Sequence, residues 1–163
     1  MLELRKITSF NMEEIIALDV AESQKEFMMV TNLRCIADAY AEIQEGNPAT
    51  AYGVYADDVP VGFVMYVITS GFTNDYFKNE PFYEKPVYFI YNFMIDERHQ
   101  GKGYGKQSLE LMLADIQTFP HGKSYLAVLF VQSKNEVARR LYASLGFIEG
   151  IADGSGLIMY KSI

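Results

Sequence analysis

A short glycine-rich segment has the residue types and spacing to bind phosphate. Residues 98–105 read Arg-His-Gln-Gly-Lys-Gly-Tyr-Gly, between an apolar run at 88–95 and an amphipathic stretch at 107–116. Glycines let the backbone approach a ligand closely and adopt positive φ. Free N–H groups at a helix start, aided by the helix dipole, hold phosphate oxygens. A tight surface turn would also use glycines, but the flanking strand and helix favour a phosphate-binding loop.

Two well-known phosphate loops do not fit this spacing. A dinucleotide-binding fingerprint needs Gly-x-Gly-x-x-Gly after the first strand, with an acidic residue about 20 positions later. Here the glycines are Gly101, Gly103 and Gly105, and they follow the fourth expected strand. A P-loop needs Gly-Lys followed by Ser or Thr, whereas Lys102 is followed by glycine.

Composition narrows the function class. The chain has 163 residues and a net charge of −7, which argues against nonspecific nucleic-acid binding and is compatible with a cationic substrate. No apolar run reaches the ~20 residues of a membrane span, and the first residues lack the apolar core of a signal peptide. We therefore expect no membrane partner and a cytoplasmic location.

Cysteine and histidine usage gives no metal signature. The one cysteine, Cys35, cannot form an intramolecular disulfide and is expected to be a small buried packing residue. His99 and His121 are far apart and have no cysteine partners, so no zinc site is expected.

The elements that position the loop follow from hydrophobic periodicity. A capping pattern at Ser23 and Glu26 predicts the start of a long helix, and Ser133 with Glu136 predicts another helix start. Strands are expected at 2–7, 51–56, 61–68, 87–95 and 124–131, with two short ones around 153–156. The long helix is expected to bury Leu33, Ile36, Ala37, Tyr40 and Ile43, and the last helix Val137, Ala138, Leu141, Tyr142 and Leu145. This order predicts one mixed α/β domain over residues 1–163.

The glycine loop and a downstream segment together resemble the GNAT superfamily of acyl-CoA-dependent N-acyltransferases. Gln100, Gly103 and Gly105 match the family's (Gln/Arg)-x-x-Gly-x-(Gly/Ala) loop. The stretch from Asn135 to Phe147 matches its Asn…Ala…(Leu/Phe)-Tyr…Gly-Phe segment. The head of the chain, with Phe27, Asn32 and the helix to Ala41, is similar to the polyamine or diamine acetyltransferase branch. The resemblance implies a mixed sheet of about seven strands, splayed between the fourth and fifth, with about four flanking helices.

The resemblance also implies where acetyl-CoA, the cosubstrate, is held. The pantetheine arm pairs like an added strand with backbone groups of Phe93, Met94 and Ile95. Asn135 binds the pantetheine or phosphate end, or is simply a polar residue at a helix start. The pyrophosphate is taken by residues 100–106, namely Gln100, Gly101, Lys102, Gly103, Tyr104, Gly105 and Lys106. Either lysine adds charge there or is merely solvated.

The implied reaction is direct acetyl transfer to an amine, and its acid is easier to assign than its base. Tyr142 occupies the family position for protonating the departing thiolate, although a buried aromatic on a helix stripe is the alternative. The expected fourth strand has no carboxylate before Asp96, and we expect Asp96 and Glu97 to be solvated. The ammonium proton then leaves by a water chain held by Tyr91 or Asn92, or through a carboxylate on the roof of the acceptor site. The candidates there are Glu22 and Glu26, which could equally lie on an exposed helix face.

These residues favour a small cationic amine or polyamine as the substrate. The aromatic connection at 72–83 suggests a closed pocket whose rings could hold an ammonium group. A protein or peptide N-acetyltransferase and a non-catalytic acetyl-CoA-binding regulatory domain remain as alternatives. The aromatic content also permits a homodimer.

Overall fold

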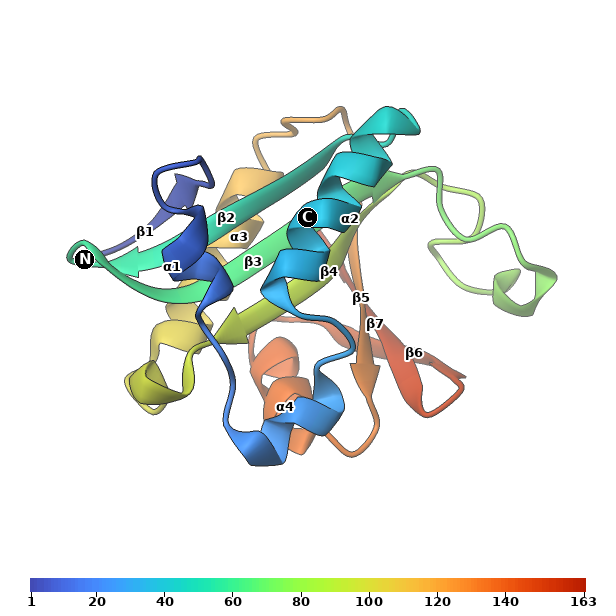
Figure 1. Cartoon of the computed structure of the whole chain (residues 1–163). Coiled ribbons are helices and arrows are strands. Elements are labelled where there is room, and N and C mark those ends of the chain that lie inside the picture. The colour runs from blue at the N-terminus through green and yellow to red at the C-terminus, as the bar shows by residue number, and fades with distance from the viewer.

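Seven strands form one mixed sheet in the computed structural model, which describes residues 1–163 (Figure 1). The spatial order is β1-β2-β3-β4-β5-β7-β6, and all neighbours are antiparallel except β4 and β5. The strands are β1 (Leu2–Lys6), β2 (Ala49–Ala56), β3 (Val59–Thr69), β4 (Val87–Ile95), β5 (Leu126–Gln132), β6 (Ile148–Asp153) and β7 (Gly156–Ser162).

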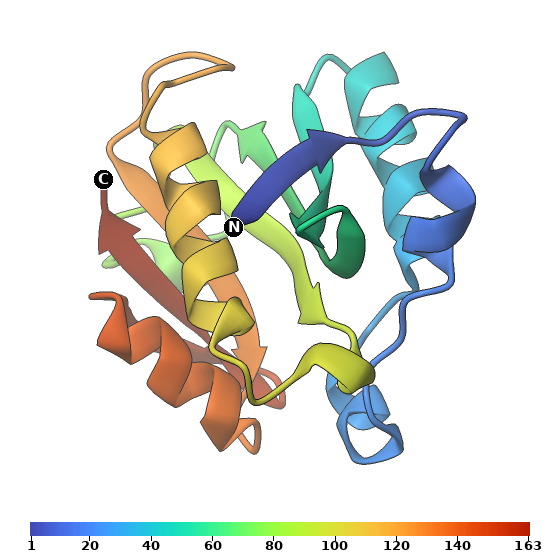
Figure 2. The ribbon, with the colours of Figure 1, turned by 90° about the vertical axis from the view of Figure 1, so that its left-hand side faces the viewer.

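Helices cover both faces of the sheet (Figure 2). The helices α1 (Met12–Ile16) and α2 (Asn32–Gln44) lie on one face, and α3 (Tyr104–Ile116) and α4 (Glu136–Ser144) on the other. Short 3-10 turns occur at η1 (Glu22–Phe27), η2 (Asp75–Phe77) and η3 (Glu97–His99). None of the helices has the length and apolar character needed to cross a membrane. The predicted fold class of seven strands and four flanking helices is confirmed.

The strands β4 and β5 pair only at one end. Tyr88–Ile90 of β4 face Ala127–Leu129 of β5, after which the two strands diverge. The register between β3 and β4 also shifts here, because Met65 faces Asn92 while Tyr66 faces Ile90. Tyr91 is thus an extra residue in β4, and such a bulge bends the strand that contains it. The end of β4 from Tyr91 to Ile95 is left without a strand partner on its β5 side, as the predicted splay requires.

The prediction for α2 was wrong in both its start and its buried face. The helix begins at Asn32 with Thr31 as its cap, whose hydroxyl accepts from the N–H of Arg34 at 3.2 Å. Residues 22–27 form the separate turn η1. Leu33, Tyr40 and Ile43 are more than half exposed, and the buried residues are Asn32, Cys35 and Ala39. Asn32 is buried because its amide donates to the carbonyls of Ile15 and Leu18, pairings that a hydropathy pattern does not register.

Two smaller predictions also need correction. The helix α4 is capped by Asn135, whose Oδ1 accepts from the N–H of Ala138 at 3.2 Å, and not by Ser133. On the same helix Val137 is 74% exposed rather than buried. The aromatic connection forms a small core of its own, in which the rings of Phe72, Phe77 and Phe82 contact one another.

Candidate active site

A cavity of about 330 Å³ lies where β4 and β5 diverge. Its walls are the unpaired end of β4, the end of β5, the start of α3 and one face of α4. The fifth wall belongs to residues 17–31 between α1 and α2, here called the roof segment. No charged residue lines the cavity. The lining residues are Val20, Gln24, Phe27, Met28, Met29, Val30, Ile90, Tyr91, Asn92, Phe93, Met94, Ile95, Gln100, Gly101, Tyr104, Gly105, Leu129, Phe130, Val131, Gln132, Asn135, Val137, Ala138, Leu141 and Tyr142.

The glycine loop leaves backbone N–H groups free at the cavity edge. Gly101 and Gly103 have φ values of +76° and +77°, in the left-handed region that favours glycine. A Cβ at either position would meet no atom closer than 3.6 Å, so backbone conformation rather than crowding selects glycine. Gly103 is the N-cap of α3 and provides no side-chain cap. The first N–H groups of α3 are therefore open to an anion.

The two lysines of this loop, unlike its backbone, lie away from the cavity. Lys102 and Lys106 are exposed and do not line the cavity. The ammonium of Lys102 donates to the carbonyl of Arg98 at 3.3 Å. Asn135 caps α4 and also lines the cavity, so its helix-start position is shown and its contact with a cofactor stays a prediction.

Tyr142 places a phenol against the unpaired end of β4. Tyr142 is 8% exposed, and its ring packs edge-on against the ring of Phe93, with the two ring centroids 6.4 Å apart. Burial raises the pKa of the Tyr142 phenol, so the hydroxyl keeps its proton near neutral pH. The Tyr142 hydroxyl forms no hydrogen bond within the protein. Every side-chain oxygen that is fully enclosed does form one, so this hydroxyl is not fully enclosed. It must therefore be reachable from the cavity, as a proton donor to a bound molecule needs to be.

The bulge in β4 turns two successive side chains toward α2. The hydroxyl of Tyr91 donates to Oδ2 of Asp38 at 2.9 Å, and the amide of Asn92 donates to Sγ of Cys35 at 2.8 Å. In a regular strand, neighbouring side chains would point to opposite faces. Burial, together with the Asp38 carboxylate, raises the pKa of Tyr91 to about 12. Because the Tyr91 hydroxyl donates its hydrogen to Asp38, the phenol oxygen remains available to accept a hydrogen bond from another group.

Asp38 was not anticipated as part of the site. Its carboxylate also accepts from Nε of Arg34 at 2.6 Å, and this pairing lowers the pKa of Asp38. The spacing of Arg34 and Asp38 is visible in the sequence as a helical i, i+4 pair. Its contact with Tyr91 depends on the bulge, which the sequence did not reveal.

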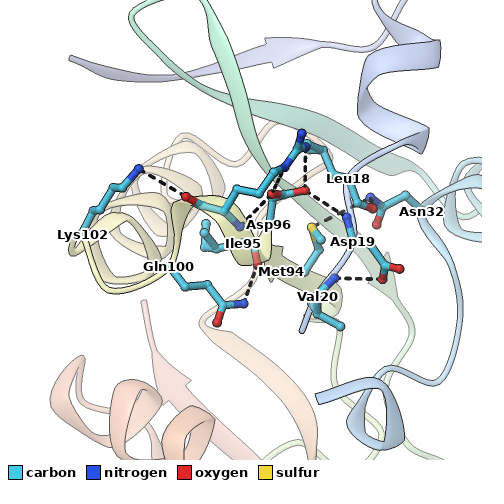
Figure 3. A network of polar contacts seen from close by, with 10 residues as sticks. Leu18, Asp19, Val20, Asn32, Met94, Ile95, Asp96, Gln100 and Lys102 are labelled. Atoms are coloured by element: carbon cyan, nitrogen blue, oxygen red, sulfur yellow. Dashed lines mark hydrogen bonds and ion pairs between the residues drawn. The ribbon is translucent and has the colours of Figure 1, made fainter. Parts of the chain in front are cut away.

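Hydrogen bonds connect the end of β4, and the turn that follows it, to the roof segment (Figure 3). Asp96, expected to be solvated, is only 2% exposed, and its carboxylate accepts from Nε of Arg98 at 2.7 Å and from the N–H of Asp19 at 3.1 Å. Burial favours the neutral acid, but Arg98 and the backbone donors prevail and lower the pKa of Asp96. The side-chain amide of Gln100 donates to Oε1 of Gln24 at 2.8 Å and to the carbonyl of Ile95 at 2.9 Å.

The roof segment supplies apolar and amide groups rather than carboxylates. Glu22 and Glu26, the carboxylates predicted for this side, do not line the cavity, and Glu22 pairs with Lys25 at 2.9 Å. The cavity is instead lined from this side by Gln24 and the run Phe27–Val30. That apolar run, directly after the short turn η1, is the signal that could have identified it.

The aromatic connection does not take part in the cavity. No residue between 70 and 87 lines it, because Phe77 and Phe82 pack over Val128 and Ile158 instead. The expected cation–π role for these rings is therefore wrong for this cavity.

Comparison with known proteins gives a family match over most of the chain. Residues 17–147 match the model of the acetyltransferase (GNAT) family. A spermine/spermidine N(1)-acetyltransferase of Bacillus subtilis is 27% identical over 165 residues, which cover 99% of both chains.

Solved structures share the fold at lower identity. A spermidine N-acetyltransferase from Vibrio cholerae, in complex with CoA and spermine, is 18% identical with a TM-score of 0.67, covering 99% of this chain and 95% of that one. An aminoglycoside acetyltransferase in complex with coenzyme A is also 18% identical, with a TM-score of 0.73 and the same coverage. Since two neighbours with different acceptors share this fold, the fold by itself does not identify the acceptor.

Proposed function

Because the chain belongs to the GNAT family and is an acetyl-CoA-dependent N-acetyltransferase, we propose that its reaction occurs in the cavity between β4 and β5 and that its acceptor is a polyamine. One observation carries the assignment of the site. The unpaired end of β4, the open start of α3 and the Tyr142 phenol all meet in a single cavity. These are an edge for an extended chain, a site for phosphate and a proton donor.

The residues present suit a bound acetyl-CoA. Backbone groups of Phe93, Met94 and Ile95 lie on the part of β4 that lacks a β5 partner, and they would hold the pantetheine arm as an added strand. The backbone of residues 100–106 would hold the pyrophosphate, and Asn135, which lines the same cavity, would bind the pantetheine or phosphate end. When bound, the cofactor supplies an acetyl thioester.

The chain's own residues then handle protons. The amine must be neutral to attack, and a free alkyl ammonium has a pKa of ~10. The cavity has no charged lining residue, and an apolar environment disfavours the ammonium form. We propose that the ammonium proton leaves through water held at Tyr91 and Asn92, that the Tyr91 oxygen accepts an N–H of the neutral amine, and that Tyr142 protonates the departing sulfur.

Support for a polyamine comes from the full-length relative that is named for spermine and spermidine. The absence of lining carboxylates suits the reacting nitrogen, which must be neutral. We propose that the remaining ammonium groups lie outside the cavity, where Glu22 and Glu26 of η1 are exposed.

A panel of acceptors tests this proposal. Acetyl-CoA is incubated with spermidine, a diamine, a monoamine of equal length and a peptide, and products are identified by mass spectrometry. We expect kcat/KM to be higher for spermidine and the diamine than for the monoamine. Equal values for the monoamine contradict the polyamine assignment. Acetylation of the peptide alone would indicate a peptide N-acetyltransferase, and cofactor binding without any transfer would indicate a regulatory domain.

A further inference from the structure

The roof segment has one polar connection to the rest of the molecule along its central part. Among residues 20–30, the sole hydrogen bond or ion pair that reaches beyond residues 19–31 joins Gln24 to Gln100. The turn η1 contains no buried residue. Val20 is buried in the core, and Met28 and Val30 pack partly against it, but apolar contacts fix orientation less strictly than a hydrogen bond does.

Both ends of the roof segment are firmly held. At its start, the N–H of Asp19 donates to the buried Asp96 (Figure 3). The carbonyl of Asp19 accepts from the N–H of Glu97 at 2.9 Å. At its end, the buried Asn32 donates to the carbonyls of Ile15 and Leu18 at 3.0 and 3.3 Å. Between these two fixed points, and after the buried Val20, residues 21–30 have few contacts that resist local opening.

Gln100 lies at the junction of the two ligand regions. It is the first residue of the expected pyrophosphate loop at 100–106, and its side-chain amide also donates to the carbonyl of Ile95 at the end of β4. Any ligand that orders residues 100–105 therefore also fixes the amide that holds Gln24. Gln24 lines the cavity beside Phe27 and Met28.

We propose that Gln24 is a positioning residue, and that its hydrogen bond with Gln100 couples cofactor binding to closure of the roof segment over the acceptor amine. This rests on the proposed function, in that the loop at 100–106 takes the pyrophosphate. Binding that rigidifies one region lowers the entropic cost of a second binding event nearby. The amine consequently binds more tightly once the cofactor is in place.

Three variants separate the hydrogen bond from the shape of the side chain. Gln24→Met keeps the length but removes the acceptor, so the KM for spermidine should rise by about fivefold, the factor for one neutral hydrogen bond. Gln24→Glu keeps an acceptor oxygen for Gln100 and should retain a KM close to that of the wild type. Ser23→Ala is the matched control, because Ser23 is exposed on the same turn and makes no hydrogen bond.

Hydrogen exchange with CoA alone gives a readout independent of turnover. In the wild type, saturating CoA should slow exchange in residues 20–30 by about fivefold. In Gln24→Met this protection should be lost, and the calorimetric Kd for CoA should rise by a similar factor of about fivefold, because the coupling between the two sites is reciprocal. Unchanged protection in Gln24→Met, or an unchanged spermidine KM, overturns the coupling.

The outcomes also distinguish this proposal from the proposed function. If the wild type does not bind CoA by calorimetry, both fail together. If CoA binds and spermidine is acetylated, but residues 20–30 exchange at the same rate with and without CoA, the coupling alone is refuted.

Discussion

Replacing Gly105 with alanine should stabilise the fold and weaken cofactor binding at the same time. Gly105 is the second residue of α3 and lines the cavity, and its φ is not positive. An added Cβ would meet Cδ2 of Leu141 at 3.7 Å and Cγ1 of Ile95 at 3.9 Å, which are ordinary contact distances. The methyl group therefore fits the protein but occupies space on the side where the pyrophosphate is expected.

The two effects have opposite signs and measurable sizes. Gly→Ala in a helix adds about 0.5–1 kcal/mol of stability, which corresponds to a Tm increase of roughly 1–4 °C for a chain of this size. Losing one hydrogen bond to a charged phosphate costs about 1.5–3 kcal/mol, and the Kd for CoA should rise by about 10- to 150-fold.

Thermal unfolding and calorimetry with CoA measure both quantities on one preparation. Glu110→Ala, an exposed residue of the same helix, serves as the control and should leave CoA binding unchanged. A Gly105→Ala protein that is as stable as expected but binds CoA like the wild type would show that the pyrophosphate does not lie against α3. A lowered Tm would instead contradict the described helix geometry.

Other predictions concern the acceptor side and the pH dependence of stability. Asp38→Asn and Tyr91→Phe should each raise the amine KM by about fivefold with little change in the Kd for CoA, because one hydrogen bond is lost; an altered Kd in calorimetry would argue against an acceptor role. The pKa of Tyr91 is raised from 10.0 to about 12, so its contribution to stability is complete below pH 10.0 and is lost as the pH rises through about 12; in urea unfolding, Tyr91→Phe should lose less stability than the wild type over that interval. Asp96→Asn should cost about 1.5–3 kcal/mol near neutral pH, and since the pKa of Asp96 is lowered, the deficit should vanish as acid protonates the wild-type carboxyl. Glu22→Gln and Glu26→Gln should raise the spermidine KM but not the monoamine KM, and equal effects on both amines would exclude a role at the distal charges.

The glycine loop shows what the sequence could predict. The order of Gly101, Gly103 and Gly105 between a strand and a helix determines a backbone conformation, and the structure has positive φ at the first two. The position of Tyr142 followed from the family resemblance, because the segment from Asn135 to Phe147 matches the family's pattern, and the structure places the Tyr142 ring against Phe93 of β4. Such features depend on short segments whose local conformation their own residues specify.

The residues on the acceptor side of the cavity could not be predicted, because they are positioned by packing between distant segments that residue spacing in the sequence does not encode. A strand read from the sequence is assumed to place successive side chains on opposite faces, so the bulge at Tyr91 in β4 could not be predicted. The contact of Tyr91 with Asp38, which depends on that bulge, could not be predicted either. The buried face of α2 was misassigned because Asn32 and Cys35 are held there by polar partners from distant segments. Glu22 and Glu26 were candidates because of their charge, whereas the roof segment lines the cavity mainly with apolar residues.

The rate of acetyl transfer by Tyr142→Phe tests the central claim most directly. The substitution keeps the ring that packs against Phe93 and removes only the hydroxyl that opens to the cavity. With saturating acetyl-CoA and spermidine, kcat should fall by about 10-fold or more, within the range for lost acid catalysis, while the Kd for CoA and the Tm stay near those of the wild type. An unchanged kcat would contradict the account and leave Tyr142 as a packing residue in a cavity whose chemistry depends on other groups.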